Sequence, residues 1–503
     1  MRSDRKARKA VVVGAGPVGC LAALALVKQG WVVDIYEGRS DMRLPSLSSS
    51  DSLRSINLAI SARGICAIRA IDPDVADRFL ENVIPMKGRM IHDKFGRQQS
   101  QLYDRDGQCI NSIDRKLLNE GLLEDVLTHP EINVFFQHKL STADFDKRTL
   151  TFHNLDSKSG HAEVQVDFDF CIGADGSYSN VRLQLMRSVR MDYQQTYIPH
   201  EYLELRMPAG KDTEGNSVFL LDPNHLHIWP RHSFMLIALP NKDKTFTCTL
   251  FAPTTEFEKL ANAEHSLKWF ESHFPDALPL IGEQAVLEDF RNNPRSPLIA
   301  IKANPYHYKD RVIILGDAAH SMVPFFGQGL NCGLEDVRIL DVLLRKAGVE
   351  PTAFLDDNTS EDTQLMSALH CYTESRHKDL VAISDLAMAN YVEMRHSVAT
   401  PSYLFRRGLD NAFSLLTFMI KITPSLIEPL LSQTPFPSSS PSGWIPLYTM
   451  ITFRPDISYS TAKEKAERQQ KIVSSFGWCV FVAGVASLGF GALKLVRHSR
   501  FMN

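Results

Sequence analysis

The sequence has few cysteines and no excess of charge of one sign. Eight cysteines are spread over 503 residues, and none belongs to a C-x-x-C pair. This scatter argues against a disulfide framework and a cysteine zinc site, and it suits a reducing compartment. The 55 Lys and Arg residues nearly balance 58 Asp and Glu residues, which leaves a net charge of −3. A chain this close to neutral has no global field that would hold it on nucleic acid.

Two catalytic signatures are also missing. The 17 histidines include no H-E-x-x-H or comparable ligand spacing, so no metal site is predicted. No G-x-S-x-G elbow precedes a helix, which removes the support for a hydrolase. The apolar share of 44% and the charged share of 22% are typical of a folded globular chain. Its length fits roughly two to four domains.

The N-terminal residues predict a dinucleotide-binding unit. An apolar strand over residues 10–13 runs into G-A-G-P-V-G, an Ala/Leu-rich helix follows, and a second strand over residues 32–36 ends at Glu37. Glycines in such a turn let the backbone approach a pyrophosphate at the helix N-terminus, and the acid can accept hydrogen bonds from ribose hydroxyls. We therefore expect the cofactor to contact Gly14, Gly16, Gly19 and Glu37.

Two later strand-to-turn segments carry glycine and aspartate. Residues 164–172 predict a strand that ends in G-A-D-G, with Arg182 soon after. Residues 311–315 predict another strand, which ends in G-D-A-A-H, and G-Q-G-L-N at 327–331 then begins a helix. Residues 200–252 alternate as strands do, whereas 366–430 are predicted to be mostly helical.

One C-terminal stretch departs from soluble composition. Residues 472–493 contain no charged side chain, and cations stand at Lys471, Lys494, Arg497 and Arg500. At 1.5 Å rise per residue the stretch spans about 33 Å, enough for a ~30 Å hydrocarbon core. The flanking cations favour a membrane span over a buried helix. We expect a C-terminal anchor with the bulk of the chain in the cytosol, and the basic tail is similar to tail anchors of the mitochondrial outer membrane.

Three separated segments together resemble the single-component FAD aromatic hydroxylases, the group typified by p-hydroxybenzoate hydroxylase. These segments are G-A-G-P-V-G with Glu37, C-I-G-A-D-G with Arg182, and R-V-I-I-L-G-D-A-A-H. The resemblance implies an α/β fold, in which a Rossmann-like FAD-binding domain is interleaved with a mixed β-sheet substrate domain. A C-terminal helical region and one transmembrane helix would complete the chain.

The domains implied by the resemblance are discontinuous. The FAD-binding domain is expected over residues 1–75, 106–190 and 297–350. The substrate-binding sheet is expected over 76–105 and 191–296. The helical region would cover 351–470 and the anchor 471–503.

Further segments resemble one branch of that group, the kynurenine 3-monooxygenases. They are R-S-I-N-L-A-I-S at 54–61, P-M-K-G-R-M-I-H at 85–92, V-P-F-F-G-Q-G at 323–329, N-Y-V-E-M-R at 390–395 and I-P-L-Y-T-M at 445–450. The resemblance implies FAD-dependent, NADPH-consuming 3-hydroxylation of L-kynurenine by O₂ through a flavin C4a-hydroperoxide, within tryptophan degradation towards NAD synthesis. Because the flavin carries this chemistry, no protein residue is expected to be catalytic.

The resemblance also implies roles for single residues. Arg89 would clamp the substrate carboxylate, which suits a bidentate guanidinium, and Tyr103 would add a hydroxyl to the same group. Phe325 would lie near the hydroxylated ring. The other substrate-side predictions are Asn390, Glu393 and Tyr448. The other cofactor-side predictions are Arg39, Ala59, Arg115, Leu140, Asp175, Asp317, Pro324, Gly329, Leu330 and Asn331.

Two alternatives stay open from the sequence. One is a related membrane-tethered flavin monooxygenase with a different substrate, such as a phenol or a lipid alkene, although Arg89, Tyr103 and Asn390 favour an amino acid. The other is a non-catalytic FAD-binding scaffold. A preference for NADPH over NADH does not follow from the residues, because Glu37 concerns FAD.

Overall fold

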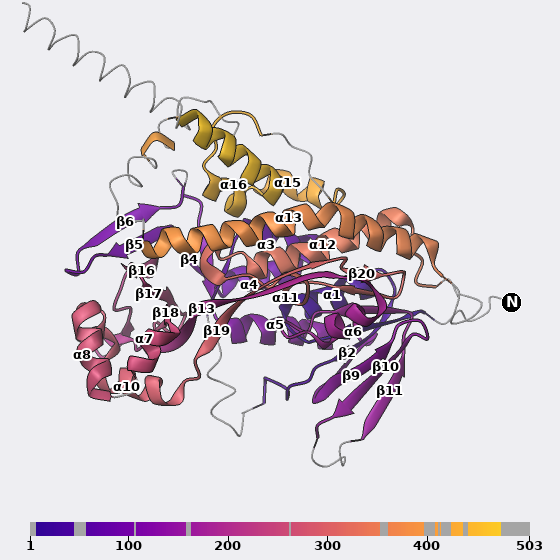
Figure 1. Ribbon diagram of the computed structural model, residues 1–503, viewed down its shortest axis with the longest axis horizontal. Coiled ribbons are helices and arrows are strands. Elements are labelled where there is room, and N and C mark those ends of the chain that lie inside the picture. Colours follow the sequence, from indigo (N-terminus) through magenta and orange to yellow (C-terminus); the bar gives the residue numbers. More distant parts are fainter. Residues whose placement is uncertain are drawn as a thin grey trace, which may run out of the picture.

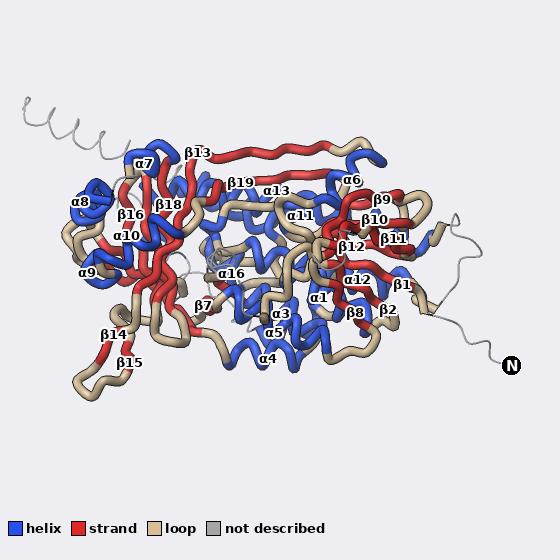
Figure 2. The backbone as a smooth tube through the Cα atoms, turned by 90° about the horizontal axis from the view of Figure 1, so that it is seen from below, coloured by secondary structure: helices blue, strands red, loops and turns tan. Residues whose placement is uncertain are grey.

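A computed structural model describes residues 7–44, 57–104, 107–156, 162–260, 263–352, 361–396, 408–410, 413, 424–435 and 441–473. Most of its strands gather at two ends of the molecule, and helices with a few short strands lie between these ends (Figure 2). The two ends are sheets of six and seven strands.

The six-stranded sheet is built around the N-terminal βαβ unit. Its order is β20-β21-β12-β1-β2-β8, and all neighbours pair in parallel except β20 with β21. Its central strands are buried on both faces, as parallel strands usually are. The strands are β1 (Lys9–Val13), β2 (Val32–Tyr36), β8 (Ile132–Phe135), β12 (Phe170–Gly173), β20 (His307–Tyr308) and β21 (Val312–Ile314).

Two helices and a small sheet complete this end. α1 (Pro17–Lys28) joins β1 to β2 and packs against α12 (Gly329–Ala347). An antiparallel sheet of β9 (His138–Asp144), β10 (Thr149–Asn154) and β11 (Glu163–Asp167) projects from the same end (Figure 1).

The single strand predicted over residues 164–172 is wrong, because it forms two strands in different sheets. β11 pairs with β10, whereas β12 pairs with β1. The change occurs at Asp169, whose N–H donates to the carbonyl of Lys9 at 2.8 Å while its carboxylate accepts from the Lys9 N–H at 2.7 Å. The backbone thus changes partners between two strands that the apolar pattern runs together.

The seven-stranded sheet has the order β19-β13-β18-β17-β16-β5-β6. All neighbours are antiparallel except β5 with β16. One face packs on α7 (Thr254–Lys259), α8 (Ala263–His273), α9 (Leu278–Ile281) and α10 (Glu283–Asn292), which enclose a core of their own. The strands are β5 (Gly88–His92), β6 (Gln98–Leu102), β13 (Asp192–Met207), β16 (His225–Arg231), β17 (Phe234–Pro240), β18 (Phe246–Pro253) and β19 (Ser296–Asn304).

Shorter elements lie between the two sheets. A three-stranded sheet has the order β3-β7-β4. These elements are β3 (Leu58–Ile60), α3 (Ala62–Ile71), α4 (Pro73–Glu81), β4 (Ile84–Met86), β7 (Ile110–Ile113), α5 (Arg115–Leu127), α6 (Asn180–Ser188), α11 (Asp317–His320) and the 3-10 turn η2 (Pro324–Phe326). A separate two-stranded ribbon joins β14 (Gly210–Lys211) to β15 (Ser217–Val218).

The C-terminal helices lie over the middle of the molecule. α13 (Thr363–His396) packs along α12, and α15 (Pro424–Leu431) and α16 (Leu447–Phe453) lie above it (Figure 1). A helical stretch over 459–473 is held to α13 by the Lys463–Asp385 ion pair of 2.8 Å.

No helix of the described residues combines the length and apolar composition that a bilayer crossing requires. The stretch 472–493, predicted to cross a membrane, lies outside the described residues from position 474 onward.

Candidate active site

The first glycine turn is built for close backbone approach. Gly14 has φ +104°, and a Cβ there would lie 2.5 Å from the carbonyl oxygen of Ala174. A Cβ on Gly19 would lie 2.0 Å from the carbonyl oxygen of Gly14. By contrast, a Cβ on Gly16 would meet no atom within 4 Å, and Gly16 precedes α1 without a side-chain cap. The turn therefore presents an uncapped helix start to open space, which fits the pyrophosphate of a dinucleotide.

Glu37 is fixed at the carboxyl end of β2. Its carboxylate accepts hydrogen bonds from the Ala15 N–H at 2.8 Å and from Arg39 Nε at 2.8 Å. Burial alone would raise the pKa of Glu37, but the Arg39 and backbone hydrogen bonds outweigh it and hold the pKa below its usual range. The Arg39 side chain is 68% exposed. An ionised acceptor thus stands beside the glycine turn, where a ribose would lie.

Asp175 of the second motif binds the start of α6. Its carboxylate accepts from the N–H groups of Asn180 at 2.7 Å and Val181 at 3.0 Å, at the start of α6. The Asn180 side chain in turn donates to the carbonyl of Leu140, a buried residue of β9, at 3.1 Å. Arg182 Nη1 donates to the carbonyl of Ala318 at 2.6 Å. These contacts join the second motif to the third; direct contact of Asp175 and Leu140 with a cofactor stays a prediction.

The third motif contains exposed and partly exposed residues together with one buried residue that holds them in place. Asp317 and Pro324 are exposed, and Gly329 and Leu330 are partly exposed at the start of α12. Asn331 is fully buried. Its side chain accepts from the Ser61 N–H at 2.8 Å and donates to the carbonyls of Ala59 at 2.9 Å and Gly327 at 2.7 Å. Asn331 therefore positions the glycine loop against β3 through its amide.

Among the other cofactor-side predictions, Arg115 lies at the first position of α5 with its side chain exposed. Arg39 and Asp317 are exposed as well. Exposed side chains of this kind are accessible to a ligand, and Arg39 also donates to Glu37.

A buried ion network beneath the glycine loop was not predicted. Glu335 accepts a hydrogen bond from Arg63 Nη1 at 2.6 Å and forms an ion pair with Arg376 Nη2 at 2.7 Å. Asp336 accepts from Arg376 Nε at 3.0 Å and forms a close pair with His320. All five side chains are at most 3% exposed. The one signal in the sequence is the adjacent Glu335-Asp336 pair near the start of the predicted helix.

Within this network, three ligand-type atoms lie near one another. The donor atoms of His320, Cys332 and Asp336 are all within 4.8 Å of each other. Arg376 also reaches this group, with Nη2 3.4 Å from Cys332 Sγ. A metal cation would meet a fixed guanidinium there, so these side chains are better explained as part of the ion network. Burial raises the pKa of Cys332, which keeps it a thiol.

The substrate-side prediction brings three distant residues together. Arg89 of β5 is 8% exposed, and its guanidinium carbon lies 5.7 Å from the Tyr103 ring centre and 5.1 Å from that of Tyr448. The two tyrosine rings stack at 4.9 Å. Burial raises the pKa of Tyr448, and the Arg89 cation opposes this shift. A buried cation in an aromatic setting suits a carboxylate attached to an apolar body.

Asn390 and Phe325 meet on the other side of this group. The Asn390 side chain donates to the carbonyl of Phe325 at 2.7 Å, and Phe325 stacks on Tyr391 at 4.2 Å. Phe326 stacks on Tyr448 at 5.8 Å. The η2 turn thus connects the tyrosine pair to the glycine loop. Glu393 lies three residues after Asn390 on α13 and is partly exposed.

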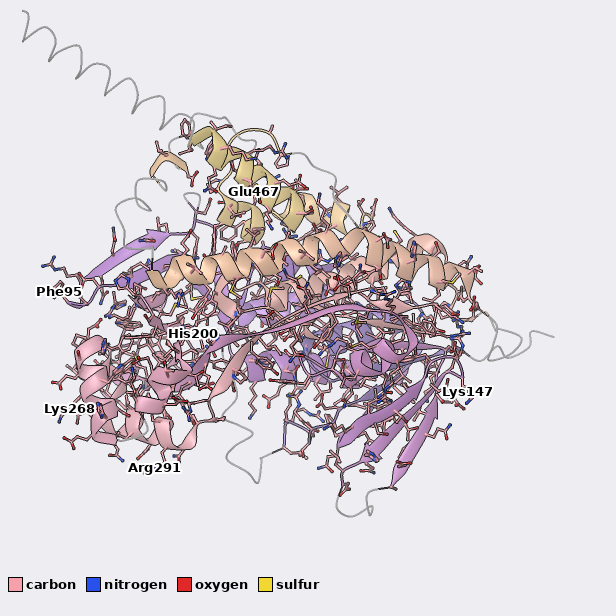
Figure 3. All side chains as sticks on the ribbon, viewed as in Figure 1. Phe95, Lys147, His200, Lys268, Arg291 and Glu467 are labelled. Atoms are coloured by element: carbon pink, nitrogen blue, oxygen red, sulfur yellow. The ribbon has the colours of Figure 1, made fainter. Side chains whose placement is uncertain are left out.

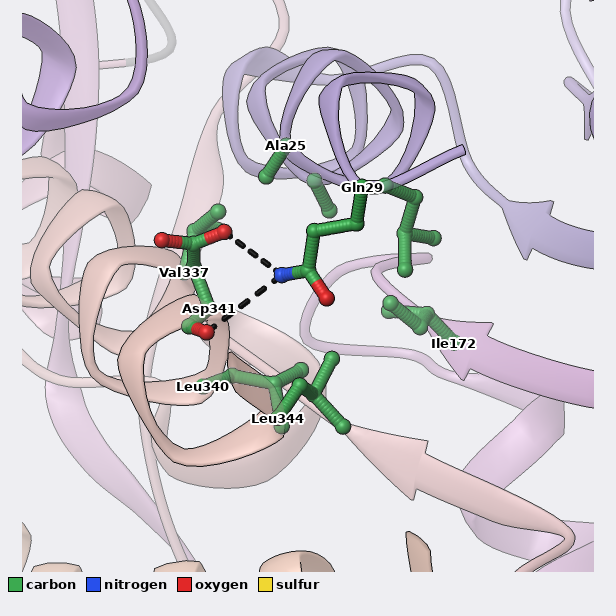
Figure 4. Close-up of a pocket in the computed structure, with 9 residues that line it drawn as sticks. Ala25, Gln29, Ile172, Val337, Leu340, Asp341 and Leu344 are labelled. Atoms are coloured by element: carbon green, nitrogen blue, oxygen red, sulfur yellow. Dashed lines mark hydrogen bonds between the residues drawn. The ribbon is translucent and has the colours of Figure 1, made fainter. Parts of the chain in front are cut away.

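A separate cavity lies beside the C-terminal half of α1 (Figure 4). Across it, Gln29 Nε2 donates to Asp341 Oδ1 at 2.7 Å. Its lining contains none of the predicted site residues, so we assign it to packing between α1, β12 and α12. The lining residues are Ala22, Ala25, Leu26, Gln29, Ile172, Val337, Leu340, Asp341 and Leu344.

Comparison with known proteins gives a family. A family model described as an FAD binding domain matches residues 8–361. The kynurenine 3-monooxygenase of Cryptococcus neoformans var. neoformans serotype D (strain B-3501A) is 45% identical, with 98% of this chain and 99% of the relative covered. The kynurenine 3-monooxygenase of Yarrowia lipolytica (strain CLIB 122 / E 150) is 44% identical, with 95% and 96% covered.

A solved structure supports the fold. The tetrameric form of 2-methyl-3-hydroxypyridine-5-carboxylic acid oxygenase superposes with a TM-score of 0.59 at 18% identity, over 79% of this chain and 95% of that one. At this identity the likeness concerns the fold alone. Given the full-length match to its curated relatives, this chain belongs to the kynurenine 3-monooxygenase family of FAD-binding proteins.

Proposed function

We propose that this protein hydroxylates L-kynurenine to 3-hydroxykynurenine, with FAD as cofactor and NADPH and O₂ as co-substrates. The observation that carries the proposal is the buried Arg89 guanidinium beside the stacked rings of Tyr103 and Tyr448. L-Kynurenine offers a carboxylate on one end and an aromatic ring on the other. A lipid alkene carries no acceptor for a guanidinium, and a phenol, which is neutral at pH 7, lacks the two oxygens of a carboxylate that a guanidinium binds in a bidentate way.

The described residues suit the cofactor as well as the substrate. Bound FAD would supply the oxygen-activating chemistry. The open face of Gly16 and the start of α1 would receive its pyrophosphate, and Glu37 would accept from its ribose. Asn331 holds the glycine loop in place through three hydrogen bonds.

The remaining residues orient the substrate and keep out water. Arg89 would hold the carboxylate, which fixes one end of the molecule. Tyr448 contacts Arg89 and stacks on Phe326, which directly precedes the glycine loop. Apolar rings at this place would protect a reactive oxidant from water. Glu393, partly exposed on α13, is the residue we propose for the substrate amine.

The test measures oxygen uptake by the purified, FAD-loaded full chain with NADPH. Adding L-kynurenine should stimulate uptake and yield a product that co-elutes with authentic 3-hydroxykynurenine. A phenol and a lipid alkene serve as competing substrates. Flavin that is bound but unaffected by L-kynurenine, with no hydroxylated product, would refute the assignment and favour a non-catalytic scaffold.

We further propose that residues 472–493 anchor the protein in the mitochondrial outer membrane, with the catalytic part in the cytosol. The support is the absence of charge over this stretch and the cations on both sides. Ile472, at the end of the described helical stretch, is 58% exposed. Alkaline carbonate extraction of mitochondria should leave the full chain in the membrane, and a chain truncated after Lys471 should be released. Release of both would overturn the anchor.

A further inference from the structure

A chain of buried histidines lies behind the strand that carries Arg89. His92 of β5 places Nδ1 2.8 Å from Asp276 Oδ2 and Nε2 2.9 Å from His227 Nδ1. His227 in turn places Nε2 2.8 Å from the backbone carbonyl oxygen of Asp222. Both imidazoles are fully buried.

The hydrogen bonds of His92 and His227 determine how many protons these two imidazoles share with Asp276. The carbonyl of Asp222 can only accept, so His227 Nε2 must carry a proton. The contact between His92 Nε2 and His227 Nδ1 needs one proton. The contact between His92 Nδ1 and the Asp276 carboxyl needs another. Three protons are therefore shared by a carboxylate and two imidazoles, one more than two neutral imidazoles hold.

The surroundings place the additional proton on His92. Burial alone would raise the pKa of Asp276, but hydrogen bonds from His92 and from Trp229 Nε1, at 2.8 Å, bring it below its usual range. Burial lowers the pKa of His227 to about 4. At the contact between Asp276 and His92 the proton sits on the imidazole, because an imidazole is the more basic of the two groups, and His92 then forms an ion pair with Asp276.

Other titratable groups pack around the chain. Arg231 Nη1 donates to the backbone carbonyl of His92 at 3.1 Å, and Arg231 Nε donates to that of His273 on α8 at 2.6 Å. His225 contacts the Asp222 carboxylate at 2.7 Å. Asp276 is the carboxylate in direct contact with His92, so it provides the balancing charge for the extra proton.

The histidine pair holds the strand that carries Arg89. Successive side chains of a strand point to opposite faces, so Arg89 and His92 lie on opposite sides of β5. On one side His92 stacks on Trp229 at 4.0 Å, and on the other Arg89 faces Tyr103 and Tyr448. β5 is the next-to-last strand of its sheet, and the His92–His227 contact fastens its side chains to β16.

We propose that His92 is a positioning residue: its imidazolium, held between Asp276 and His227, fixes β5 and thereby the Arg89 guanidinium on the opposite face. The inference rests on the proposed role of Arg89 in binding the substrate carboxylate. Loss of the shared proton at high pH breaks one of the three contacts, so affinity for L-kynurenine falls as this proton leaves.

The first experiment measures L-kynurenine binding to the FAD-loaded full chain from the change in flavin absorbance, between pH 6 and pH 9. His92→Gln should weaken binding on the order of tenfold at pH 6, because one hydrogen bond to a charged group is lost, and should flatten the pH dependence. Under saturating substrate its kcat should change little. Asp276→Asn, which removes the balancing charge, should move the fall in affinity to lower pH.

His307→Asn is the matched control. His307 lies on β20, away from Arg89, and contacts Thr373 Oγ1 at 2.7 Å. Its loss should leave L-kynurenine affinity and the pH profile unchanged. Flavin content and melting temperature are recorded for every variant, so that unfolding is distinguished from displacement of the Arg89 guanidinium.

The second experiment reads the proton directly. With ¹⁵N-labelled histidine in the full chain, one imidazolium signal should persist at neutral pH, vanish in His92→Gln and titrate at lower pH in Asp276→Asn. His92→Gln with wild-type affinity at every pH, or a neutral His92 in the spectrum, overturns the inference. If the wild-type protein does not bind L-kynurenine, both the proposed function and this inference are wrong. If it binds L-kynurenine but His92→Gln leaves the affinity unchanged, only this inference is wrong.

Discussion

Arg63 and Arg376 bind the two oxygens of one buried carboxylate, that of Glu335, at 2.6 Å and 2.7 Å. Arg63 also donates to the carbonyls of Ile457 at 2.7 Å and Arg454 at 3.1 Å. One side chain of α3 thereby connects α12, which begins at the glycine loop, with the C-terminal segment that carries Tyr448. The same ion network therefore holds both the predicted cofactor residues and the predicted substrate residues in place.

The first prediction concerns this carboxylate. Glu335→Gln removes the carboxylate that pairs with the buried Arg63 and leaves Arg376 with Asp336 and Asp379, which should lower the free energy of unfolding by about 3–5 kcal/mol. Chemical denaturation of the full chain measures it. Lys268→Gln is the control, because Lys268 forms an exposed ion pair with Glu264 on the surface of α8 (Figure 3) and should cost at most about 1 kcal/mol. Equal costs for the two variants would contradict a supporting role for the network.

The second prediction concerns Arg89. Arg89→Ala should raise the KM for L-kynurenine by the equivalent of about 2–5 kcal/mol, because the substrate carboxylate loses a buried partner. Arg89→Lys should recover part of this loss, since it keeps the charge but not the bidentate geometry. Steady-state kinetics with measured flavin content provide the readout. An unchanged KM in Arg89→Ala would place the carboxylate elsewhere.

The sequence predicted the parts of this site that depend on local backbone. Gly14, Gly16 and Glu37 could be identified because a tight turn between a strand and a helix demands glycine, and an acid ends the next strand. The meeting of Arg89 with Tyr448 came only from resemblance, since no local rule brings a strand residue next to a helix far along the chain.

Other features were outside the reach of sequence patterns. The break at Asp169 depends on which strand pairs with its backbone, and no glycine or proline within residues 164–172 indicates a break. The Arg63–Glu335–Arg376 network depends on three helices packing together. The cofactor contact of Asn331 stays a prediction; what the sequence did not indicate is that its side-chain amide holds the glycine loop.

The third prediction follows from the ionised state of Glu37. Because the folded state holds the pKa of Glu37 below the ordinary 4.5, the group stabilises the fold above pH 4.5 and loses this contribution as pH falls through the lower folded value. Glu37→Gln should therefore be less stable than the wild type at pH 7, and the difference should shrink in acid. Melting temperatures between pH 3 and pH 7 test this, and a difference that grows in acid would contradict it.

The last prediction separates folding from cofactor binding at the first glycine turn. Gly14→Ala places a methyl group 2.5 Å from the Ala174 carbonyl oxygen at a φ of +104°, so it should lower the stability of the protein even without flavin. The added methyl group of Gly16→Ala meets no protein atom within 4 Å. The free energy of unfolding of the flavin-free protein should therefore stay within about 0.5 kcal/mol of the wild-type value. Because the pyrophosphate is expected at that open face, the same methyl group should weaken FAD binding on the order of tenfold or more. Fluorescence titration of flavin-free protein measures the affinity. Wild-type affinity in Gly16→Ala, with the fold intact, would move the pyrophosphate away from the α1 turn.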